Sequence, residues 1–264
     1  MELPPSRRLA LIVEYDGAKY HGFQVQVGVP TIQGEIESAL AKLTGERIRV
    51  IGAGRTDAGV HAKGQVVSFK TASSLSLQIL IRALNFYLMP YIAVRYGEEV
   101  EGGFNARKDA VSREYRYTVL NRLAPSPLRR NYAYLVPVAL NTEVMNEACQ
   151  SLLGSHDFAS FTGPMRGKST IRNVYRAEVS REEELVLFDL VADSFLPKQV
   201  RNTVGALVRV GLGKLAVEGF EEILRVKKPG LAVPAAPAHG LCLMQVNYPE
   251  HKFGKRQIYE NLQH

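Results

Sequence analysis

Segments with strand-like and helix-like patterns alternate in a definite order over the first hundred residues. Strands are expected over residues 7–17, 47–54, 64–71 and 91–100, and helices over residues 31–45 and 74–88. Thr31 can cap the start of the first helix, Gly45 lies just past its end, and Pro90 closes the second helix. The order β-α-β-β-α-β is that of the split βαβ, or ferredoxin-like, unit, which is also the topology of RNA-recognition motifs.

The second half of the chain repeats this order in an expanded form. Strands are expected over residues 112–121, 132–137 and 240–249, with a hairpin over 174–193 that turns near 182–184, and helices over 142–154, 198–213 and 220–228. The sequence therefore predicts an α+β protein with two domains, residues 1–106 and residues 107–264. The two ferredoxin-like halves are expected to join their sheets side by side around a central active-site cleft.

The charge balance favours a nucleic-acid partner. Lys and Arg number 33 against 26 Asp and Glu, which gives a formal net charge of +7. Hydrophobic residues make up 46% of the chain, as in ordinary globular proteins, and no apolar run approaches the roughly 18 to 20 residues of a membrane span. Cys149 and Cys242 are too few and too isolated for a disulfide framework or a zinc site, so a cytoplasmic protein without membrane contact is expected.

The stretch "GAGRTDAGVHAKGQ", residues 52–65, holds one carboxylate, Asp57, in a glycine-rich loop. The glycines allow close approach of the backbone to a large ligand, and a nearby Arg55 would keep the carboxylate ionised and nucleophilic. From spacing alone, an aspartate in such a loop is more commonly a turn former that accepts hydrogen bonds from backbone amides two residues on. No second acid lies at glycosidase spacing, because Glu35 and Glu37 are assigned to the solvated side of their helix.

Motifs for other chemistries are missing. The sequence contains no GxxxxGK[ST] phosphate loop, and "GAG" after a strand opens no GxGxxG helix, which argues against nucleotide or dinucleotide cofactors. His61 belongs to no HExxH or HxE…CxxC pattern and is interpreted as a polar loop histidine, so no metal site is expected.

Six stretches together resemble one known family. "GRTDAGVHAKGQVVSF" resembles the signature motif of the TruA family of tRNA pseudouridine synthases, and the likeness runs from about residue 8 to residue 250. The other stretches that carry it are "EYDGAKYHGFQVQ", "FNARKDAVSREYRYTVLN", "HDFASFTG", "FLPKQVRNTVGALVRVG" and "GLCLMQVNY". The resemblance implies the pseudouridine synthase fold.

The resemblance also implies a role for each of five residues. Asp57 takes the place of the catalytic aspartate, and Tyr115 takes the place of the tyrosine that stacks on the target base. Leu243 matches an apolar residue that packs against the uracil, and Arg201 matches the basic residue that pairs with the aspartate. Arg55 matches an arginine that enters the RNA stack as the base leaves it.

The implied reaction converts uridine to pseudouridine at positions 38, 39 and 40 in the anticodon arm of tRNA. Because the reaction is an isomerisation, no cofactor is expected, and the target base must leave its stack. Family members are homodimers. Basic loop residues are candidates for phosphate contacts: Arg122, Arg129, Arg130, Arg166, Lys168 and Arg172. Lys198 departs from the histidine that many members carry there, which is expected to alter an RNA contact more than the chemistry.

Several alternatives stay open at this level. A non-catalytic RNA-binding protein with two RRM-like units is the main alternative, although "KGQVVSFK" lacks the central aromatic residues of a stacking platform. A nucleosidase that breaks the same type of bond is another. Tyr117, two residues after Tyr115, is expected to pack, and Asn202 is left out of the catalytic set because it can cap or bridge structure. The atom that Asp57 attacks is undetermined among C1′, C6 and the C2′ proton.

Overall fold

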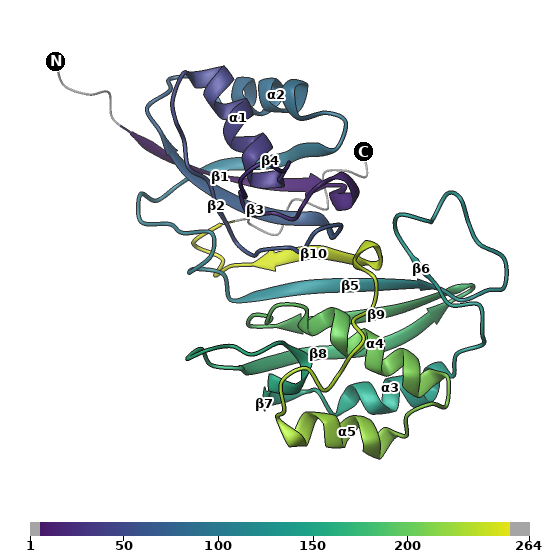
Figure 1. The fold of residues 1–264 in the computed structure, drawn as a ribbon. Helices are drawn as coiled ribbons and strands as arrows, with labels where there is room; N and C mark the ends of the chain where they lie inside the picture. The colour runs from purple at the N-terminus through teal and green to yellow at the C-terminus, as the bar shows by residue number, and fades with distance from the viewer. Residues whose placement is uncertain (1–5, 254–264) are drawn as a thin grey trace. The chain divides into compact units, whose positions relative to one another are not determined.

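The computed structural model of the protein describes residues 6–253, which form ten strands and five α-helices (Figure 1). The predicted α+β class is confirmed. The described residues divide into two compact units. Unit 1 consists of residues 6–111 and 243–253, and unit 2 consists of residues 112–242. Within residues 6–253, no helix has both the length and the apolar character needed to cross a membrane.

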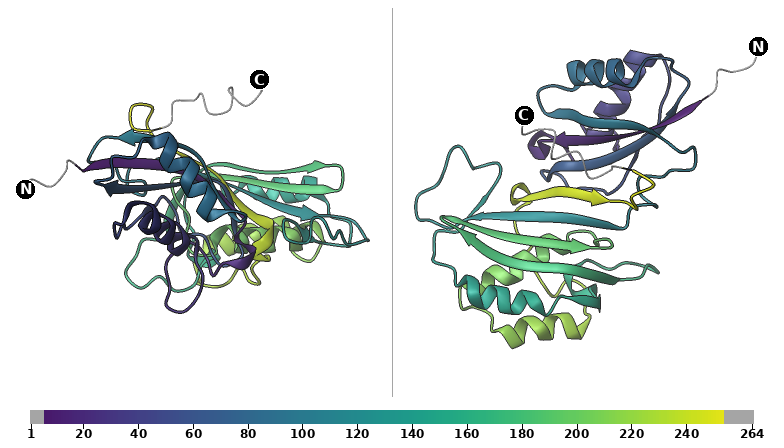
Figure 2. Two further views of the ribbon diagram at one scale, coloured as in Figure 1. Left: turned by 90° about the horizontal axis from the view of Figure 1, so that it is seen from above. Right: turned by 180° about the vertical axis from the view of Figure 1, so that it is seen from behind.

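Unit 1 is a sheet with helices on one face (Figures 1 and 2). The strand order is β4-β1-β3-β10, with β2 paired to β3. The strands are β1 (Arg7–Tyr15), β2 (Ile51–Gly52), β3 (His61–Thr71), β4 (Ile92–Val100) and β10 (Leu241–Asn247). The helices are α1 (Ile32–Thr44) and α2 (Leu77–Leu88), and a 3₁₀ turn, η1 (Gly17–Lys19), follows β1.

Helix α1 begins and ends where the local pattern predicts. The Thr31 hydroxyl accepts a hydrogen bond from the Gly34 amide at 3.3 Å, and Gly45 adopts the left-handed conformation (φ 73°) just after the helix. Ile36 and Leu40 on its inner face are fully buried. Local capping and helical periodicity therefore account for this element without help from the rest of the fold.

The strand predicted over residues 47–54 is much shorter than expected, because β2 covers only Ile51–Gly52. The backbone of Val50 bonds to helix α1 instead of to the sheet: its amide donates to Glu37 Oε1 at 3.1 Å, and its carbonyl accepts from Gln33 Nε2 at 3.2 Å. The expectation that Glu37 lies on a solvated face was therefore wrong. Its side chain is only 17% exposed, whereas Glu35 is exposed as predicted.

The last strand belongs to a different part of the molecule from the one its position in the sequence suggested. Residues 243–253 were expected in the second domain, but they pack with unit 1, where β10 is the neighbour of β3. Gly64 of β3 lies so close to β10 that a Cβ there would be 2.4 Å from the Met244 carbonyl oxygen. The Val111 amide also donates to the Asn247 carbonyl. Long-range strand pairing thus overrides the order of the chain.

Unit 2 contains the other strands of the structure, again with helices on one face (Figures 1 and 2). The strand order is β5-β9-β8-β7, and β6 pairs with β5 in parallel. The strands are β5 (Ser112–Leu120), β6 (Tyr134–Leu135), β7 (Gly154–Asp157), β8 (Ile171–Glu182) and β9 (Leu185–Ala192). The helices are α3 (Thr142–Gln150), α4 (Gln199–Gly211) and α5 (Val217–Val226), with 3₁₀ turns η2 (Ala159–Phe161) and η3 (Ala238–Gly240).

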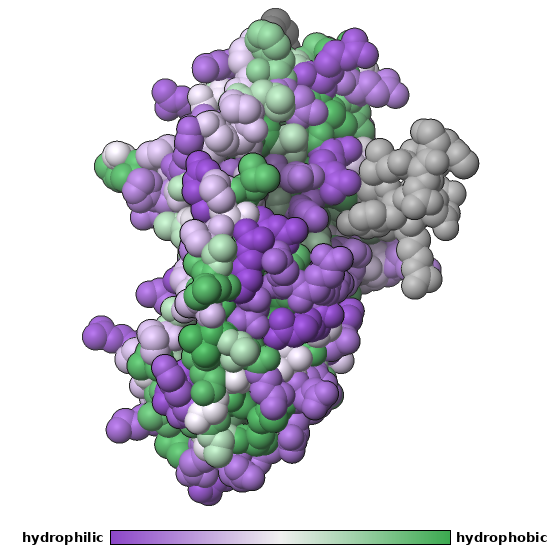
Figure 3. Space-filling model, turned by 90° about the vertical axis from the view of Figure 1, so that its right-hand side faces the viewer, coloured by the Kyte–Doolittle hydropathy of each residue, from purple (hydrophilic) through white to green (hydrophobic). Residues whose placement is uncertain are grey.

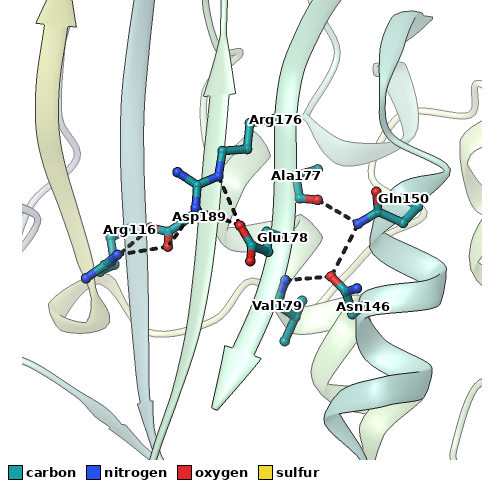
Figure 4. Close-up of polar contacts among 8 residues, drawn as sticks. All are labelled: Arg116, Asn146, Gln150, Arg176, Ala177, Glu178, Val179 and Asp189. Atoms are coloured by element: carbon teal, nitrogen blue, oxygen red, sulfur yellow. Dashed lines mark hydrogen bonds and ion pairs between the residues drawn. The ribbon is translucent and has the colours of Figure 1, made fainter. Parts of the chain in front are cut away.

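Ion pairs across three strands of unit 2 match the register of the sheet (Figure 4). Arg116 of β5 holds Asp189 of β9 through two hydrogen bonds of 2.8 and 2.9 Å, and Arg176 of β8 lies between Asp189 and Glu178. These bonds raise the pKa values of Arg116 and Arg176 above the ordinary arginine range. Since neighbouring residues of a strand face opposite sides, this register puts Tyr115 on the buried face.

Strand β8 extends past the end of its partner β7, which pairs only with residues 171–174. Polar side chains of α3 cover the part of β8 that follows (Figure 4). The Val179 amide donates to Asn146 Oδ1 at 2.9 Å, and Gln150 Nε2 donates to the Ala177 carbonyl at 2.9 Å. These bonds satisfy backbone groups of β8 in place of a neighbouring strand, which protects the edge of the sheet.

The two-residue turn from Glu182 to Leu185, which joins β8 to β9, confirms the predicted hairpin.

Candidate active site

The loop that carries Asp57 leaves the sheet of unit 1 after β2. The Ala53 amide still bonds to the Val66 carbonyl of β3 at 2.8 Å, and the chain then diverges until β3 begins at His61. Within the loop, Arg55 is exposed, Thr56 is buried and Asp57 is half-buried. The alternation shows that Thr56 anchors the loop while its two charged neighbours reach the surface.

The loop is packed against residues 16–23, which come from a different quoted stretch of the sequence. The Phe23 amide donates to the Thr56 carbonyl at 3.1 Å, and the Gly59 amide donates to the Tyr20 carbonyl at 3.3 Å. A Cβ at Gly17 would lie 2.0 Å from the Val60 carbonyl oxygen, and one at Gly22 would lie 2.7 Å from that of Thr56. Glycine is required at both positions because two backbone segments touch there.

His61 connects the same two segments. Its Nδ1 lies 3.1 Å from the Gly17 amide and 3.1 Å from Asp16 Oδ1. The nitrogen can accept a hydrogen bond from Gly17 or donate one to Asp16, depending on where the imidazole proton sits. His61 therefore joins the two segments and is almost fully buried at the start of strand β3, where the sequence suggested a polar loop histidine. Among residues 6–253, no three His, Cys, Asp or Glu side chains gather closely enough to hold a metal ion.

Tyr115 lies in unit 2, on β5, with only 8% of its surface exposed. Its ring meets that of Phe195 edge to face, with centroids 5.2 Å apart. Tyr117 is fully buried, and its hydroxyl donates to the Pro237 carbonyl at 2.8 Å. Burial raises the pKa of Tyr117 far above the ordinary tyrosine value. The prediction that Tyr117 packs is confirmed.

Arg201 projects from α4 onto the extended segment 228–237 that follows α5. Its Nε donates to the Ala236 carbonyl at 2.8 Å, and the Ala236 amide donates to the Arg201 carbonyl at 2.9 Å. One turn further along α4, a Cβ at Gly205 would be 2.2 Å from the Pro234 carbonyl oxygen. The 228–237 segment therefore lies directly on the helix, and it orients the arginine side chain.

The "HDFASFTG" stretch holds this arrangement together, a role that sequence reasoning did not assign. Asn202 Nδ2 donates to the Phe161 carbonyl at 2.7 Å, so Asn202 bridges structure. The Ser160 hydroxyl accepts from the Lys228 amide at 3.0 Å, and the Thr162 hydroxyl donates to the Pro197 carbonyl at 3.0 Å. All three side chains are buried, and buried polar groups of this kind signal a structural junction.

The predicted site residues fall into two sets. Arg55 and Asp57 share one loop of unit 1, and Leu243, fully buried on β10, belongs to the same unit. Tyr115 and Arg201 belong to unit 2. That the two sets come together in one active site stays a prediction.

The six cations predicted to contact phosphate differ in their hydrogen bonding and exposure. Three of them make hydrogen bonds within the protein: Arg122 to Glu184 and the Ala124 carbonyl, Arg130 to the Pro127 carbonyl, and Arg172 to the Ser169 and Ile171 carbonyls. Arg129, Arg166 and Lys168 are exposed. One face of the molecule carries a broad group of hydrophilic residues among smaller hydrophobic groups (Figure 3). The exposed loop cations are the better candidates for a polyanionic partner.

Known proteins share the sequence over most of its length. Residues 11–102 and 148–249 match the family model described as "tRNA pseudouridine synthase". The tRNA pseudouridine synthase A of Roseiflexus castenholzii is 46% identical over 249 residues, 92% of each chain, and that of Legionella pneumophila (strain Corby) is 41% identical over 252 residues, 95% of each chain. The solved archaeal box H/ACA sRNP Nop10-Cbf5 complex matches at a TM-score of 0.30 and 14% identity, over 76% of this chain and 44% of that chain.

Proposed function

The chain belongs to the tRNA pseudouridine synthase family, and from this premise we propose that it isomerises uridine to pseudouridine at positions 38, 39 and 40 in the anticodon arm of tRNA, with Asp57 as its catalytic carboxylate. The observation that carries the proposal is the Asp57 loop: Thr56 is buried as an anchor, and on either side of it Arg55 is exposed and Asp57 is half-buried. A carboxylate held in this way is ready to act on a bound nucleotide.

The isomerisation leaves the atoms of the substrate unchanged in number. The N1–C1′ bond breaks, a C5–C1′ bond forms, C5 loses a proton and N1 gains one. Asp57 acts as the ionised carboxylate that engages the sugar or the base during the bond exchange. The target uridine must leave its stack to reach the carboxylate, and Arg55, which is exposed beside Asp57, is suited to enter the vacated space.

The other predicted residues supply the rest of the proposed site. Tyr115 offers an aromatic face for the flipped uracil, with Leu243 as an apolar contact, and Arg201 offers a guanidinium to pair with Asp57. Recognition of the anticodon arm across three adjacent positions requires contacts to the phosphate backbone, for which Arg129 is an exposed candidate. A homodimer and a cytoplasmic location remain predictions drawn from the sequence.

The Asp57→Asn variant tests the proposal. Because the amide keeps the shape of the carboxylate but loses its charge, turnover should fall below about one-thousandth of wild type, equivalent to roughly 4 kcal/mol of transition-state stabilisation. The affinity for tRNA should stay within a few-fold. The measurements are tritium release from tRNA carrying [5-³H]uridine, filter binding, and mapping of pseudouridine on unmodified tRNA.

Glu99→Gln is the matched control, since it also removes one negative charge from unit 1, at an exposed position far along the sheet in β4. It should behave like wild type in every assay. Turnover by Asp57→Asn at a rate near that of wild type would exclude Asp57 as the catalytic group. Pseudouridine formed only outside positions 38–40 would exclude the proposed target.

A further inference from the structure

Two buried polar side chains, Gln65 of β3 and Tyr15 of β1, lie next to the loop that presents Asp57. Gln65 is 0% exposed and Tyr15 is 3% exposed. Burial of a side-chain amide is unfavourable unless its hydrogen bonds are made, so the partners of such a group reveal its role. Each side chain has a hydrogen-bond partner in the loop, at Gly54 or Thr56, and Gln65 Oε1 also accepts from the Val66 amide at 3.2 Å.

The side-chain amide of Gln65 forms hydrogen bonds with both backbone polar groups of Gly54. Its Nε2 donates to the Gly54 carbonyl at 2.9 Å, and its Oε1 accepts from the Gly54 amide at 3.4 Å. Backbone bonds join Ala53 to Val66 immediately before this point. The side-chain amide thus continues the strand pairing by one residue. Because a side chain is interposed there, the loop separates from β3 at Gly54.

Tyr15 holds the loop two residues further on. Its hydroxyl lies 2.8 Å from Thr56 Oγ1 and 3.4 Å from Gln65 Nε2. The Thr56 carbonyl is also occupied, by the Phe23 amide. The hydroxyl of Tyr15 therefore links the two anchors of the loop, Gly54 and Thr56, into one buried network.

The two anchors alternate with the two charged residues of the loop. Gly54 and Thr56 are tied into the unit, whereas Arg55 is exposed and Asp57 is half-buried. Fixing the backbone on both sides of Arg55, and immediately before Asp57, restricts the directions in which both side chains can point. Preorganised positioning of this kind contributes to rate without adding to substrate affinity.

We propose that Gln65 and Tyr15 are positioning residues, which hold the Gly54–Thr56 backbone in the conformation that directs Asp57 at its target. The inference rests on the proposed function of Asp57. It assigns no contact with substrate to either residue. Loss of either side chain should lower kcat and leave KM for tRNA nearly unchanged.

Gln65→Met is the first test, because methionine has a similar length and no amide. We expect kcat to fall about 10-fold to 100-fold, with KM changed by less than about threefold. Hydrogen exchange of the Gly54 amide should accelerate in the same variant. Ser68→Ala is the matched control, since Ser68 is a buried polar residue of the same strand whose hydroxyl accepts from the Ala106 amide, away from the loop.

The Tyr15–Thr56 bond gives a second test that does not depend on Gln65→Met folding. Tyr15→Phe and Thr56→Val each remove the bond with little change in volume, and each should lower kcat about 10-fold, while Thr56→Ser keeps the hydroxyl and should restore the rate. Because both variants break the same bond, the double variant Tyr15→Phe/Thr56→Val should be no slower than the slower single variant.

The outcomes separate this inference from the function on which it rests. If Asp57→Asn keeps wild-type turnover, the proposed function fails. If Asp57→Asn is inactive but Thr56→Val and a folded Gln65→Met keep wild-type kcat, only the positioning inference fails. An equal loss of kcat in Ser68→Ala would also overturn it, since the effect would then belong to β3 in general.

Discussion

The two units hold their proposed functional side chains by different means. In unit 1, Gln65 bonds to the backbone of the Asp57 loop at Gly54, and Tyr15 bonds to the side chain of Thr56 in the same loop. In unit 2, Arg201 is itself a donor to the 228–237 segment, so its orientation depends on how that segment lies on α4. The difference predicts that replacement of Arg201 lowers stability as well as turnover, because its side chain itself holds the 228–237 segment.

Both units share one device, which is glycine at the places where backbones meet. Gly17 and Gly22 allow residues 16–23 to touch the Asp57 loop, and Gly205 allows the 228–237 segment to touch α4. The comparison can therefore be tested with single methyl groups. The substitutions below are ordered from the largest expected effect to the smallest.

Gly17→Ala should have the largest effect. The new methyl group would lie 2.0 Å from the Val60 carbonyl oxygen, which belongs to the backbone and has no rotamer to change. We expect a loss of about 3 kcal/mol in the free energy of unfolding and a severe loss of turnover, measured by urea denaturation and tritium release. Gly103→Ala, at a position of unit 1 with nothing within 4 Å, should be close to neutral. A Gly17→Ala protein with wild-type stability would show that the two segments are not tightly packed.

Gly205→Ala tests the coupling in unit 2. Alanine favours a helix by about 1 kcal/mol over glycine, but its methyl group would lie 2.2 Å from the Pro234 carbonyl oxygen. The steric clash should outweigh the gain in helix propensity, so the free energy of unfolding should fall by about 1–2 kcal/mol. Activity should fall in parallel, because the bonds of Arg201 to Ala236 are disturbed.

Gly219→Ala in α5 is the control for helix propensity. Its methyl group would meet only Leu215 Cδ1, the end of a flexible side chain, at 2.9 Å. This variant should be as stable as wild type or more stable by up to about 1 kcal/mol. Equal gains in Gly205→Ala and Gly219→Ala would contradict the close contact between α4 and the 228–237 segment.

Tyr117→Phe removes one bond to the same segment. The Pro237 carbonyl would lose its donor, which should cost about 1 kcal/mol in the free energy of unfolding. Tyr175→Phe, at an exposed tyrosine of β8, should be neutral by comparison. If the two variants unfold at the same denaturant concentration, the Tyr117 bond contributes nothing to the docking of the segment.

Replacement of the buried thiol of Cys149 in unit 2 should have the smallest effect, a change in the pH dependence of the free energy of unfolding that is visible only at alkaline pH. Burial raises the pKa of Cys149 from 9.0 to about 12. The unfolded chain ionises first, so the stability from the neutral thiol is complete below pH 9 and is lost as the pH rises toward the folded value. Between about pH 8 and about pH 10, Cys149→Ala should lose less free energy of unfolding than wild type does. Cys242→Ala is the matched substitution, and an equal pH response in all three proteins would refute the assignment.

Local patterns in the sequence predicted most of the elements. The Thr31 cap, the left-handed Gly45 and the hairpin after Glu182 follow from neighbouring residues alone, and the structure confirms them. Asp57 was identified as a candidate by its loop and by the family resemblance. The strand over 47–54 was predicted too long, because the partner that takes the Val50 backbone is Glu37, on a helix that precedes it in the chain.

The sequence by itself determined the α+β class, the order of most of the elements and the chemical types available to a site, because these depend on short-range periodicity, turns and composition. The short strand β7 was not predicted. Only the tertiary structure decided that β10 returns to unit 1, that Gln65 and Tyr15 grip the Asp57 loop, and that the 228–237 segment orients Arg201. The physical reason is that a buried polar side chain is defined by its partner, and its partner lies wherever the folded chain brings a backbone group within hydrogen-bonding distance.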